Sequence, residues 1–314
     1  MSCYNMIVQT FAVAVLIHGS PTTIAGSRST KSLPSDGIIT EPGHYQLEQD
    51  LVVARDTGVT ITADDVTFDL GGHALRFRAE PREGSYGILV NGRKNIRITN
   101  GSITAFWFNI HCIDSQGLRV DHVRFDDIPY IAVNIAGTHN VLISDNTFTH
   151  FRYEIPKPKN DRYVIGINIG AVDAVIAHNH FNAHYAGKPE GPDLETVFIL
   201  FSADISKGCV VTHNQMVANT LLNRSYGIWT GSNTHVTIAH NTIHNMKYGL
   251  CLGENATAMA GSNQFSINPS FEDAHTVETF GIHAAVAKKI WIADNEFENI
   301  STQVIPPKEN HEKQ

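Results

Sequence analysis

Short runs in which apolar and polar residues alternate recur along the whole chain. One clear copy has three such runs, around Val236–Ile238, Thr242–His244 and Gly249–Leu252. Alternation with a period of two indicates half-buried β-strands, and a helical period of 3.6 is missing from these runs. Each copy therefore predicts three short strands separated by turns.

Two sequence markers show that these strands belong to a repeat. The first is an Asn in the pattern Ile-x-x-Asn-x-Ile/Phe, and the second is Tyr-Gly-Ile or a close variant. Asn241 and Asn263 are 22 residues apart, which sets the shortest period. The Asn column, with its substitutes, runs through Gly71, Gly101, Val123, Asn146, Asn179, Asn214, Asn241, Asn263 and Asn295, and the second marker begins at Tyr86, Val164, Tyr226, Tyr248 and Phe280.

Three strands in about 22 residues predict one coil of a β-solenoid. A propeller blade needs about twice that length. A leucine-rich repeat needs a Leu/Asn consensus that this sequence lacks.

On these markers the chain resembles the right-handed parallel β-helix superfamily, which is pectate-lyase-like or pectin-lyase-like. Its tandem coils are similar to the carbohydrate-binding and sugar-hydrolase repeat type, which also contains the periplasmic copper-binding accessory proteins of nitrous oxide reductase. The resemblance covers about residues 38–300. It implies an all-β fold, a right-handed parallel β-helix (solenoid) of about nine coils, with residues 26–50 covering its N-terminal end.

The resemblance also gives the Asn column a structural role. Its side chains are expected to stack from coil to coil at the turn between the second and third strands, and to bond main-chain groups there. We expect these Asn residues to take the left-handed conformation at the turn, as Gly71 and Gly101 do more easily. Val123 breaks the column, so its coil must turn differently.

Composition and charge narrow the class of protein. The 314 residues are 42% hydrophobic and 17% charged, which fits a globular chain with a large core. A net charge of −8 argues against nucleic acid as the main partner. No apolar run after residue 25 is long enough for a membrane span. The four Cys lack metal-ligand spacing and are interpreted as core thiols or, for Cys3, as part of the leader. The oligomeric state stays open.

The N-terminus has the pattern of a targeting segment. Residues 1–25 read as a signal peptide, although their first part carries no Lys or Arg. The alternatives are a start-site extension or a buried N-terminal cap. Residues 26–304 form the predicted β-helix domain and residues 305–314 a polar tail, so we expect a secreted or periplasmic protein.

Insertions predict where the functional site lies. Nearly all of them fall after the second run of a coil and before its Tyr-Gly-Ile marker, at 76–85, 151–163, 184–195 and 266–279. In the resembled fold this is the third turn. Loops at one turn of stacked coils stand side by side, so we expect them to form a wall beside the first sheet, which makes the floor.

The alternation also predicts which residues of the first strand face outward. The residue after the Ile of each marker is one such position, and the Gly before that Ile is expected on the same outer face, where it lets a ligand approach the backbone. The predicted outward column is Leu89, His111, Asn134, Asn168, Leu200, Trp229, Cys251 and His283. Trp229 is a candidate for stacking on a sugar ring.

The favoured function is a polysaccharide lyase, which cleaves uronate-containing glycans by β-elimination. That reaction needs a neutralised carboxylate, a base and an acid. The two longest central loops concentrate suitable residues. The catalytic candidates are Tyr153, Lys157, Arg162, His184 and Tyr185, and the substrate-binding candidates are Arg152, Arg224, His111, Asn134, Asn168 and Trp229.

Two other functions stay open. A glycoside hydrolase needs a pair of carboxylates, for which Asp193, Glu195 and Asp204 are candidates. Asp126 and Asp127 are expected on the run between the second and third strands, away from the floor. A non-catalytic glycan- or copper-binding protein is the other alternative, with His178, His213 and His240 as weak metal candidates. The sequence establishes no cofactor, and a requirement for Ca²⁺ stays open.

Overall fold

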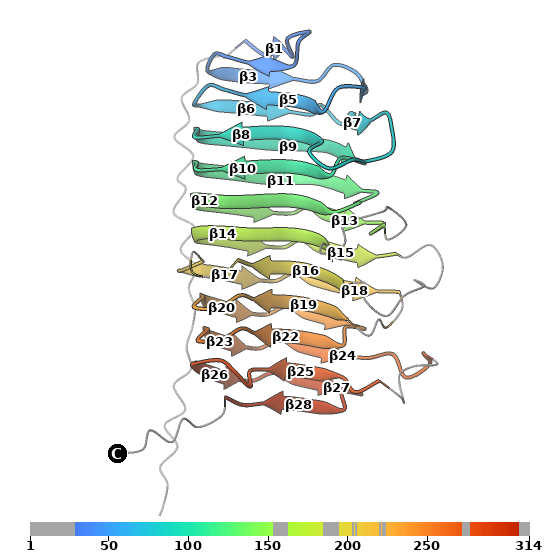
Figure 1. The fold of residues 1–314 in the computed structure, drawn as a ribbon, viewed down its shortest axis with the longest axis vertical. Coiled ribbons are helices and arrows are strands. Elements are labelled where there is room, and N and C mark those ends of the chain that lie inside the picture. Colours follow the sequence, from blue (N-terminus) through green and yellow to red (C-terminus); the bar gives the residue numbers. More distant parts are fainter. Residues whose placement is uncertain are drawn as a thin grey trace, which may run out of the picture.

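The computed structural model describes residues 29–152, 163–184, 195–202, 204, 206–219, 221, 224–271 and 277–307. These residues form strands and turns, with no helix among them. Each strand pairs in parallel with its counterparts one repeat earlier and one repeat later, so the chain winds into a column of stacked coils (Figure 1). Side chains of alternate residues point into this column, which explains the period of two in the sequence.

Three parallel sheets run along the column, one for each strand of the coil. The first sheet contains β2 (Ile38–Ile39), β5 (Thr57–Ile61), β8 (Tyr86–Asn91), β10 (Phe108–Ile113), β16 (Glu195–Phe201), β19 (Ser225–Thr230), β22 (Tyr248–Leu252), β25 (Phe280–His283) and β28 (Thr302–Ile305). The second contains β1 (Lys31–Ser32), β3 (Gly43–Gln46), β6 (Val66–Asp69), β17 (Cys209–Thr212), β20 (His235–Ala239), β23 (Thr257–Gly261) and β26 (Lys289–Ala293).

The third sheet contains β4 (Leu51–Val53), β7 (Ala74–Phe77), β13 (Thr147–Thr149), β15 (His180–Ala183), β18 (Gln215–Ala218), β21 (Thr242–His244), β24 (Gln264–Ser266) and β27 (Glu296–Glu298). Four long strands pass from one sheet to the next. They are β9 (Lys94–Thr104) and β11 (Gln116–Asp126), which join the second and third sheets, and β12 (Ile131–Ser144) and β14 (Tyr163–Ala177), which join the first and second.

The described strands make ten complete coils, one more than the nine expected. The additional coil runs from β2 to β4 and carries neither sequence marker. Residues 31–46, expected to cover the N-terminal end, instead add strands to the first and second sheets. A terminal coil has a neighbour on one side alone, so its residues are under less constraint to follow the repeat.

Stacked apolar side chains fill the column. Phe125, Phe148 and Phe181 are fully buried, with ring centroids 4.8 and 4.5 Å apart along the stack. Ile243 continues this buried column, while Phe297 in the last full coil is half-buried. The inward positions of the repeats are therefore confirmed.

The Gly of the Tyr-Gly-Ile marker faces inward, contrary to the sequence-based expectation. A Cβ added to Gly249 would lie 2.2 Å from Cδ1 of Phe265, and one added to Gly281 would lie 2.2 Å from Cε1 of Phe297. The Gly and the residue after it are both buried, although the strand keeps one register on either side of the Gly. The Gly that recurs in the marker makes room for side chains of the third sheet rather than for a ligand.

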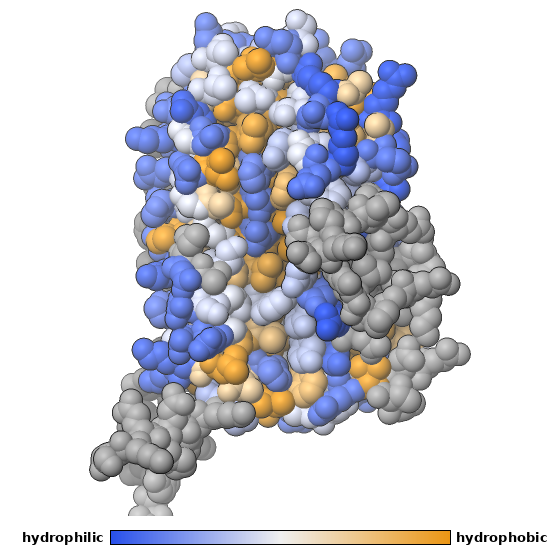
Figure 2. Space-filling view, viewed as in Figure 1, coloured by the Kyte–Doolittle hydropathy of each residue, from blue (hydrophilic) through white to orange (hydrophobic). Residues whose placement is uncertain are grey.

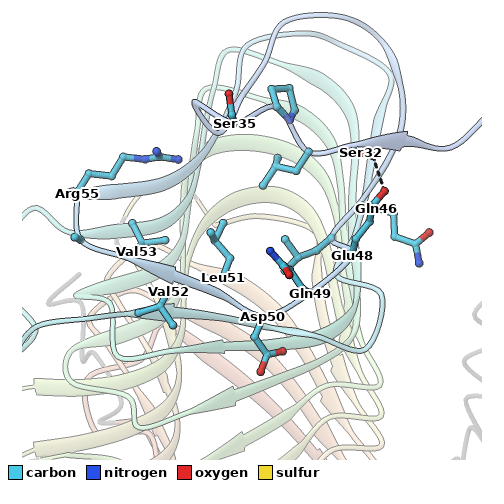
Figure 3. A pocket seen from close by; sticks show the side chains of 14 residues that line it. Ser32, Ser35, Gln46, Glu48, Gln49, Asp50, Leu51, Val52, Val53 and Arg55 are labelled. Carbon is cyan, nitrogen blue, oxygen red and sulfur yellow. Dashed lines mark hydrogen bonds between the residues drawn. The ribbon is translucent and has the colours of Figure 1, made fainter.

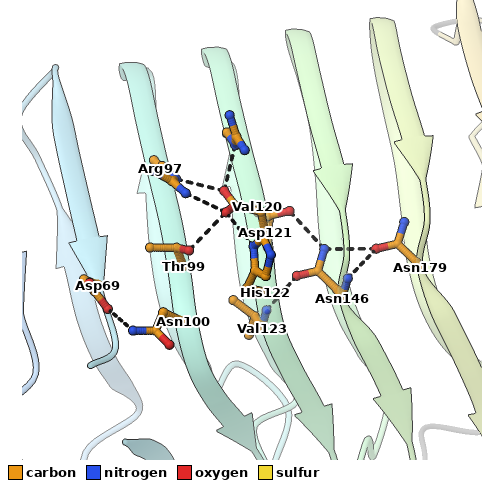
Figure 4. Close-up of polar contacts among 11 residues, drawn as sticks. Asp69, Arg97, Thr99, Asn100, Val120, Asp121, His122, Val123, Asn146 and Asn179 are labelled. Atoms are coloured by element: carbon orange, nitrogen blue, oxygen red, sulfur yellow. Dashed lines mark hydrogen bonds and ion pairs between the residues drawn. The ribbon is translucent and has the colours of Figure 1, made fainter. Parts of the chain in front are cut away.

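The column of Asn residues forms a buried hydrogen-bonded ladder (Figure 4). Asn214 illustrates the pattern. Its Nδ2 donates to the carbonyl oxygens of Ile176 and Thr212 and to Oδ1 of Asn241, while its Oδ1 accepts from the backbone N–H and Nδ2 of Asn179. The ladder runs from Asn146 to Asn295 and ends against Val123, whose N–H bonds Oδ1 of Asn146 at 2.9 Å.

The left-handed residue of this turn is the one before each ladder Asn, not the Asn itself. His178, His213 and His240 have φ of 57°, 54° and 55°. Asn, Asp and His are the non-Gly residues that adopt this conformation most readily. The histidines that precede the Asn are thus explained by turn geometry.

Candidate functional site

The outer face of the first sheet carries the predicted floor residues in one register. His111 of β10 pairs with Asn134 of β12, which pairs with Asn168 of β14. The same column continues through Leu200, Trp229, Cys251 and His283, as expected. Parallel in-register pairing brings these side chains together at intervals of about one strand spacing, ~4.8 Å.

Polar residues in the middle of this column bond one another. Nδ2 of Asn134 lies 2.8 Å from Nδ1 of His111, and Nδ2 of Asn168 donates to Oδ1 of Asn134 at 2.7 Å. Ser202, which the sequence analysis did not select, donates from Oγ to Oδ1 of Asn168 at 3.1 Å. We call His111, Asn134, Asn168 and Ser202 the outer ladder.

Two stacked aromatic rings lie against the His111 end of the outer ladder. The His111 ring centroid lies 5.2 Å from that of Tyr86 and 5.0 Å from that of Phe108. Burial lowers the pKa of His111, because the charged imidazolium would lose water contacts here. His111 is therefore neutral at neutral pH.

An apolar patch lies beside the outer ladder on the same face. Ile131, Ile165 and Val197 are buried there under partly exposed side chains that include Tyr163, Tyr226 and Trp229. Figure 2, drawn from the side on which the first sheet faces the viewer, shows an apolar strip interrupted by polar residues along the long axis. The Trp229 ring stacks on Tyr226 with centroids 4.8 Å apart, so one of its faces is already covered within the protein.

Arg224 forms an ion pair rather than presenting a free cation. Its Nη1 lies 2.6 Å from Oε1 of Glu195, the first residue of β16. The other oxygen of Glu195, Oε2, is buried and has no hydrogen-bond partner in the structure. Glu195 pairs in register with Tyr163 of β14, so this carboxylate lies where the first-sheet strands begin.

Arg152 is likewise paired, and its partners correct an expectation about Asp126 and Asp127. Nε of Arg152 lies 3.2 Å from Oδ1 of Asp127, and its Nη2 lies 3.2 Å from Oε2 of Glu80. Asp126 ends β11 and Asp127 follows it, so this doublet lies at the third turn beside the inserted loops. The expectation that it lies between the second and third strands was wrong by one turn, because β11 spans both strands without interruption.

The two carboxyl groups of this doublet differ in their pKa. Burial raises the pKa of Asp127, and Arg152 opposes this only in part. Burial acts in the same direction on Asp126, but hydrogen bonds from His150 (2.5 Å) and Thr149 (2.8 Å) outweigh it and lower the pKa. Paired carboxyl groups whose pKa values are pushed apart are candidates for acid and base roles.

His184 lies at the end of the third sheet. Its ring packs edge-on against His150 at 5.7 Å, and its Nδ1 lies 3.4 Å from Nδ2 of Asn219. Both neighbours follow third-sheet strands, so His184 belongs to the same turn as Asp126 and Asp127. The remaining catalytic candidates, Tyr153, Lys157, Arg162 and Tyr185, lie outside the described residues, as does Asp193.

Asp204 does not join Glu195 as a second carboxylate. It is exposed, its N–H bonds the Ser232 carbonyl at 2.9 Å, and its side chain accepts from Asn233. These contacts place it at the turn between the first and second sheets, on the far side of β16 from Glu195. Closeness in sequence misled here because one strand separates the two residues.

The three histidines considered as metal ligands stack face to face. Ring centroids are 5.1 Å apart for His178 and His213 and 4.9 Å apart for His213 and His240. Parallel rings do not direct their lone pairs at one point. Within the ranges that the structure describes, no group of three or more His, Cys, Asp or Glu side chains is arranged to hold a metal ion.

A buried carboxylate on the second sheet forms a separate polar cluster (Figure 4). Asp121 is fully buried and accepts from Arg97 at 2.7 and 2.9 Å and from Arg119 at 2.7 Å. Thr99 and His122 also bond it. Burial would raise the pKa of Asp121, but these donors lower it well below its usual range. With all its partners supplied by the protein, this cluster is structural.

The N-terminal end of the column contains a hollow of about 680 Å³ (Figure 3). Residues from β1, β3, β4 and their connections line it, including Leu33, Leu51 and Arg55. It lies at the N-terminal end of the first complete coil that the structure describes. It lies away from the outer ladder.

A search for membrane-spanning segments in the described residues identifies no helix with the length and apolar character to cross a bilayer. No curated protein matches the sequence.

Solved structures with a similar course of the chain differ in their activities. A surface adhesin of Streptococcus pneumoniae, PfbA, is 12% identical over 90% of this chain and 79% of its own, with a TM-score of 0.42. An alginate lyase from Paenibacillus is 14% identical over 77% and 99%, with a TM-score of 0.42. An endo-xylogalacturonan hydrolase from Aspergillus tubingensis is 13% identical over 87% and 85%, with a TM-score of 0.39. Likenesses this weak carry no argument about activity.

A match to a known protein family establishes the fold of this chain. Residues 15–188, more than half of the chain, match the family described as "Right handed beta helix region". The three parallel sheets and the stacked coils agree with that match. The chain therefore belongs to the right-handed β-helix family.

Proposed function

We propose that the protein binds an extended glycan along the outer face of the first sheet. The outer ladder is the observation that carries this proposal. It places four hydrogen-bonding side chains in one row beside an apolar, aromatic-rich patch. Sugars present hydroxyl groups at their edges and C–H groups on their faces, so a polar row next to aromatic surface suits them.

The reaction we favour is β-elimination on a uronate-containing glycan. A base removes the C5 proton, the C4–O bond breaks as the C4=C5 double bond forms, and the departing oxygen takes a proton. Charge builds up on the uronate carboxylate during this step, so a donor at that carboxylate accelerates it. We assign this donor role to His111. The proposed proton-transfer groups are His184, Tyr153 and Tyr185.

Export of the protein is part of this proposal, since polymeric glycans lie outside the cell. No step is assigned to a metal. The described residues offer no group that fits Ca²⁺ or copper, so a metal requirement remains an open element of the proposal.

Replacing His111 tests the proposed site. His111→Phe keeps a ring among Tyr86 and Phe108 but removes both nitrogens, and we expect kcat/KM to fall about 10²–10³-fold. Activity is measured as the ultraviolet absorbance of unsaturated products from a panel of uronate polymers. His235→Phe, on the exposed edge of the second sheet, is the control and should retain activity. Equal activity in both variants would place the chemistry elsewhere.

Hydrolysis is the second candidate, favoured by the buried, unpartnered Oε2 of Glu195. A hydrolase needs a second carboxyl group, for which Asp127 with its raised pKa is available. New reducing ends without ultraviolet absorbance from the same panel would establish hydrolysis. Binding without either product would favour the non-catalytic alternative.

A further inference from the structure

The hydrogen bonds of the outer ladder all point in one direction. Ser202 donates to Oδ1 of Asn168, and Nδ2 of Asn168 donates to Oδ1 of Asn134. This uses the carbonyl end of the Asn134 amide and turns its Nδ2 toward His111 at 2.8 Å. An amide nitrogen donates and does not accept, so Nδ1 of His111 must be the acceptor.

A neutral imidazole carries one proton, on one of its two nitrogens. With Nδ1 accepting from Asn134, the proton is on Nε2. We infer that Asn134, Asn168 and Ser202 are positioning residues that fix His111 as the Nε2–H tautomer, which makes its outer nitrogen a hydrogen-bond donor to substrate. The tautomer is independent of the proposed function, whereas the donation to substrate rests on it.

Two further observations support this assignment. The rings of Tyr86 and Phe108 lie against His111 and burial lowers its pKa, so the neutral form dominates at neutral pH. A neutral Nε2–H does not accept the C5 proton, which assigns the base to another residue. It does donate to an oxygen on which negative charge develops, and as a neutral donor it adds this stabilisation without a permanent charge.

Because the hydrogen bonds of the outer ladder share one direction, a change at Asn168 should alter His111 without touching it. Asn168→Asp replaces the donor with oxygens that accept only. Asn134 must then turn its Nδ2 toward residue 168 and its Oδ1 toward His111, which moves the imidazole proton to Nδ1. A residue that does not bond His111 thereby changes its tautomer. Asn182→Asp, at an exposed position on the third sheet, is the matched control for adding a carboxylate.

The tautomer is read by NMR on protein labelled with ¹⁵N-histidine, with the resonances of His111 assigned by their loss in His111→Phe. We expect a proton on Nε2 in the wild type and in Asn182→Asp, and on Nδ1 in Asn168→Asp. A proton on Nδ1 in the wild type, or the same tautomer in wild type and Asn168→Asp, would overturn the inference.

If Asn168→Asp does not fold, Asn134→Asp is the second test variant. The carboxylate of the new Asp accepts directly from His111, so it also requires a proton on Nδ1. Neither readout uses a glycan. If the tautomer behaves as expected but the panel of uronate polymers yields no product and no binding, the proposed function fails and the inference about His111 stands.

Discussion

Two ladders of asparagine side chains run along this molecule, and they differ in what their amides bond. In the inner ladder, from Asn146 to Asn295, each amide in the middle of the row bonds main-chain groups of neighbouring coils as well as the next Asn. In the outer ladder, Asn134 and Asn168 bond side chains. The inner amides satisfy buried backbone groups, whereas the outer amides bond one another and, in our inference, orient His111.

The comparison shows that residue type alone does not decide whether a repeated Asn in a solenoid has a structural or a functional role. Its position in the coil decides, because the Asn side chains at the turn between the second and third strands are buried and the first-sheet column is partly exposed. The following predictions separate the two ladders by their effects on stability and on activity.

The largest effect on stability is expected from Asn214→Leu in the inner ladder. The change leaves the backbone N–H of Asn179 and the carbonyl of Ile176 without partners in the interior. Unsatisfied buried groups cost about 1–3 kcal/mol each, so the free energy of unfolding should fall by roughly 3 kcal/mol or more. Urea unfolding followed by circular dichroism measures it. A fall below about 1 kcal/mol would show that the inner ladder is dispensable.

Asn134→Leu in the outer ladder is expected to give the opposite pattern. Stability should change by about 1 kcal/mol or less, because no buried backbone group loses a partner. Glycan turnover should fall at least about tenfold, since His111 loses the bond that orients it. Paired urea titrations and activity measurements on this variant and on Asn214→Leu test the contrast directly. Similar stability losses in both variants would remove the distinction between the ladders.

The smallest effect on stability is expected from replacing His213, the residue before Asn214 of the inner ladder. Burial and the neighbouring His240 and His178 lower the pKa of His213 below its ordinary value of 6.5. The unfolded chain then binds more protons than the folded chain just below pH 6.5, so stability should decrease as the pH falls through 6.5 and level off below the folded pKa.

His213→Asn keeps a residue that accepts the left-handed φ of 54° and removes this titration. Its melting temperature should therefore depend less steeply on pH between 7 and 5 than that of the wild type. His235→Asn, an exposed histidine outside the stack, is the control. An unchanged slope in His213→Asn would assign the pH dependence to other groups.

The fold could be predicted from the sequence because each coil repeats the same pattern of residues. Each coil must offer inward apolar residues, a turn and the same register to its neighbours, so Phe148, Phe181 and Asn214 have equivalents throughout. Terminal coils face one neighbour, and the coil from β2 to β4 was missed for that reason. The inward Gly was missed because alternation places successive residues on opposite faces, whereas Gly249 and Leu250 are both buried.

Of the candidate site, the sequence predicted only the positions of the column on the first sheet. His111, Asn134 and Asn168 occupy one in-register column, which periodicity alone defines. Their partner Ser202 follows the end of β16 and lies outside the repeated pattern of that strand. The charge partners of Arg152 and Arg224 were missed as well, because Asp127 and Glu195 meet them across coils and no local signal marks such pairs.

The regular coil also makes the length of this protein adjustable. Each coil is held by bonds to the coil before and the coil after, so a duplicated coil of about 22 residues would insert without shifting any other register. One more coil would lengthen the first-sheet face by about 4.8 Å. Under the proposed function, the number of repeats, rather than any single residue, would set the length of glycan that this face can accommodate.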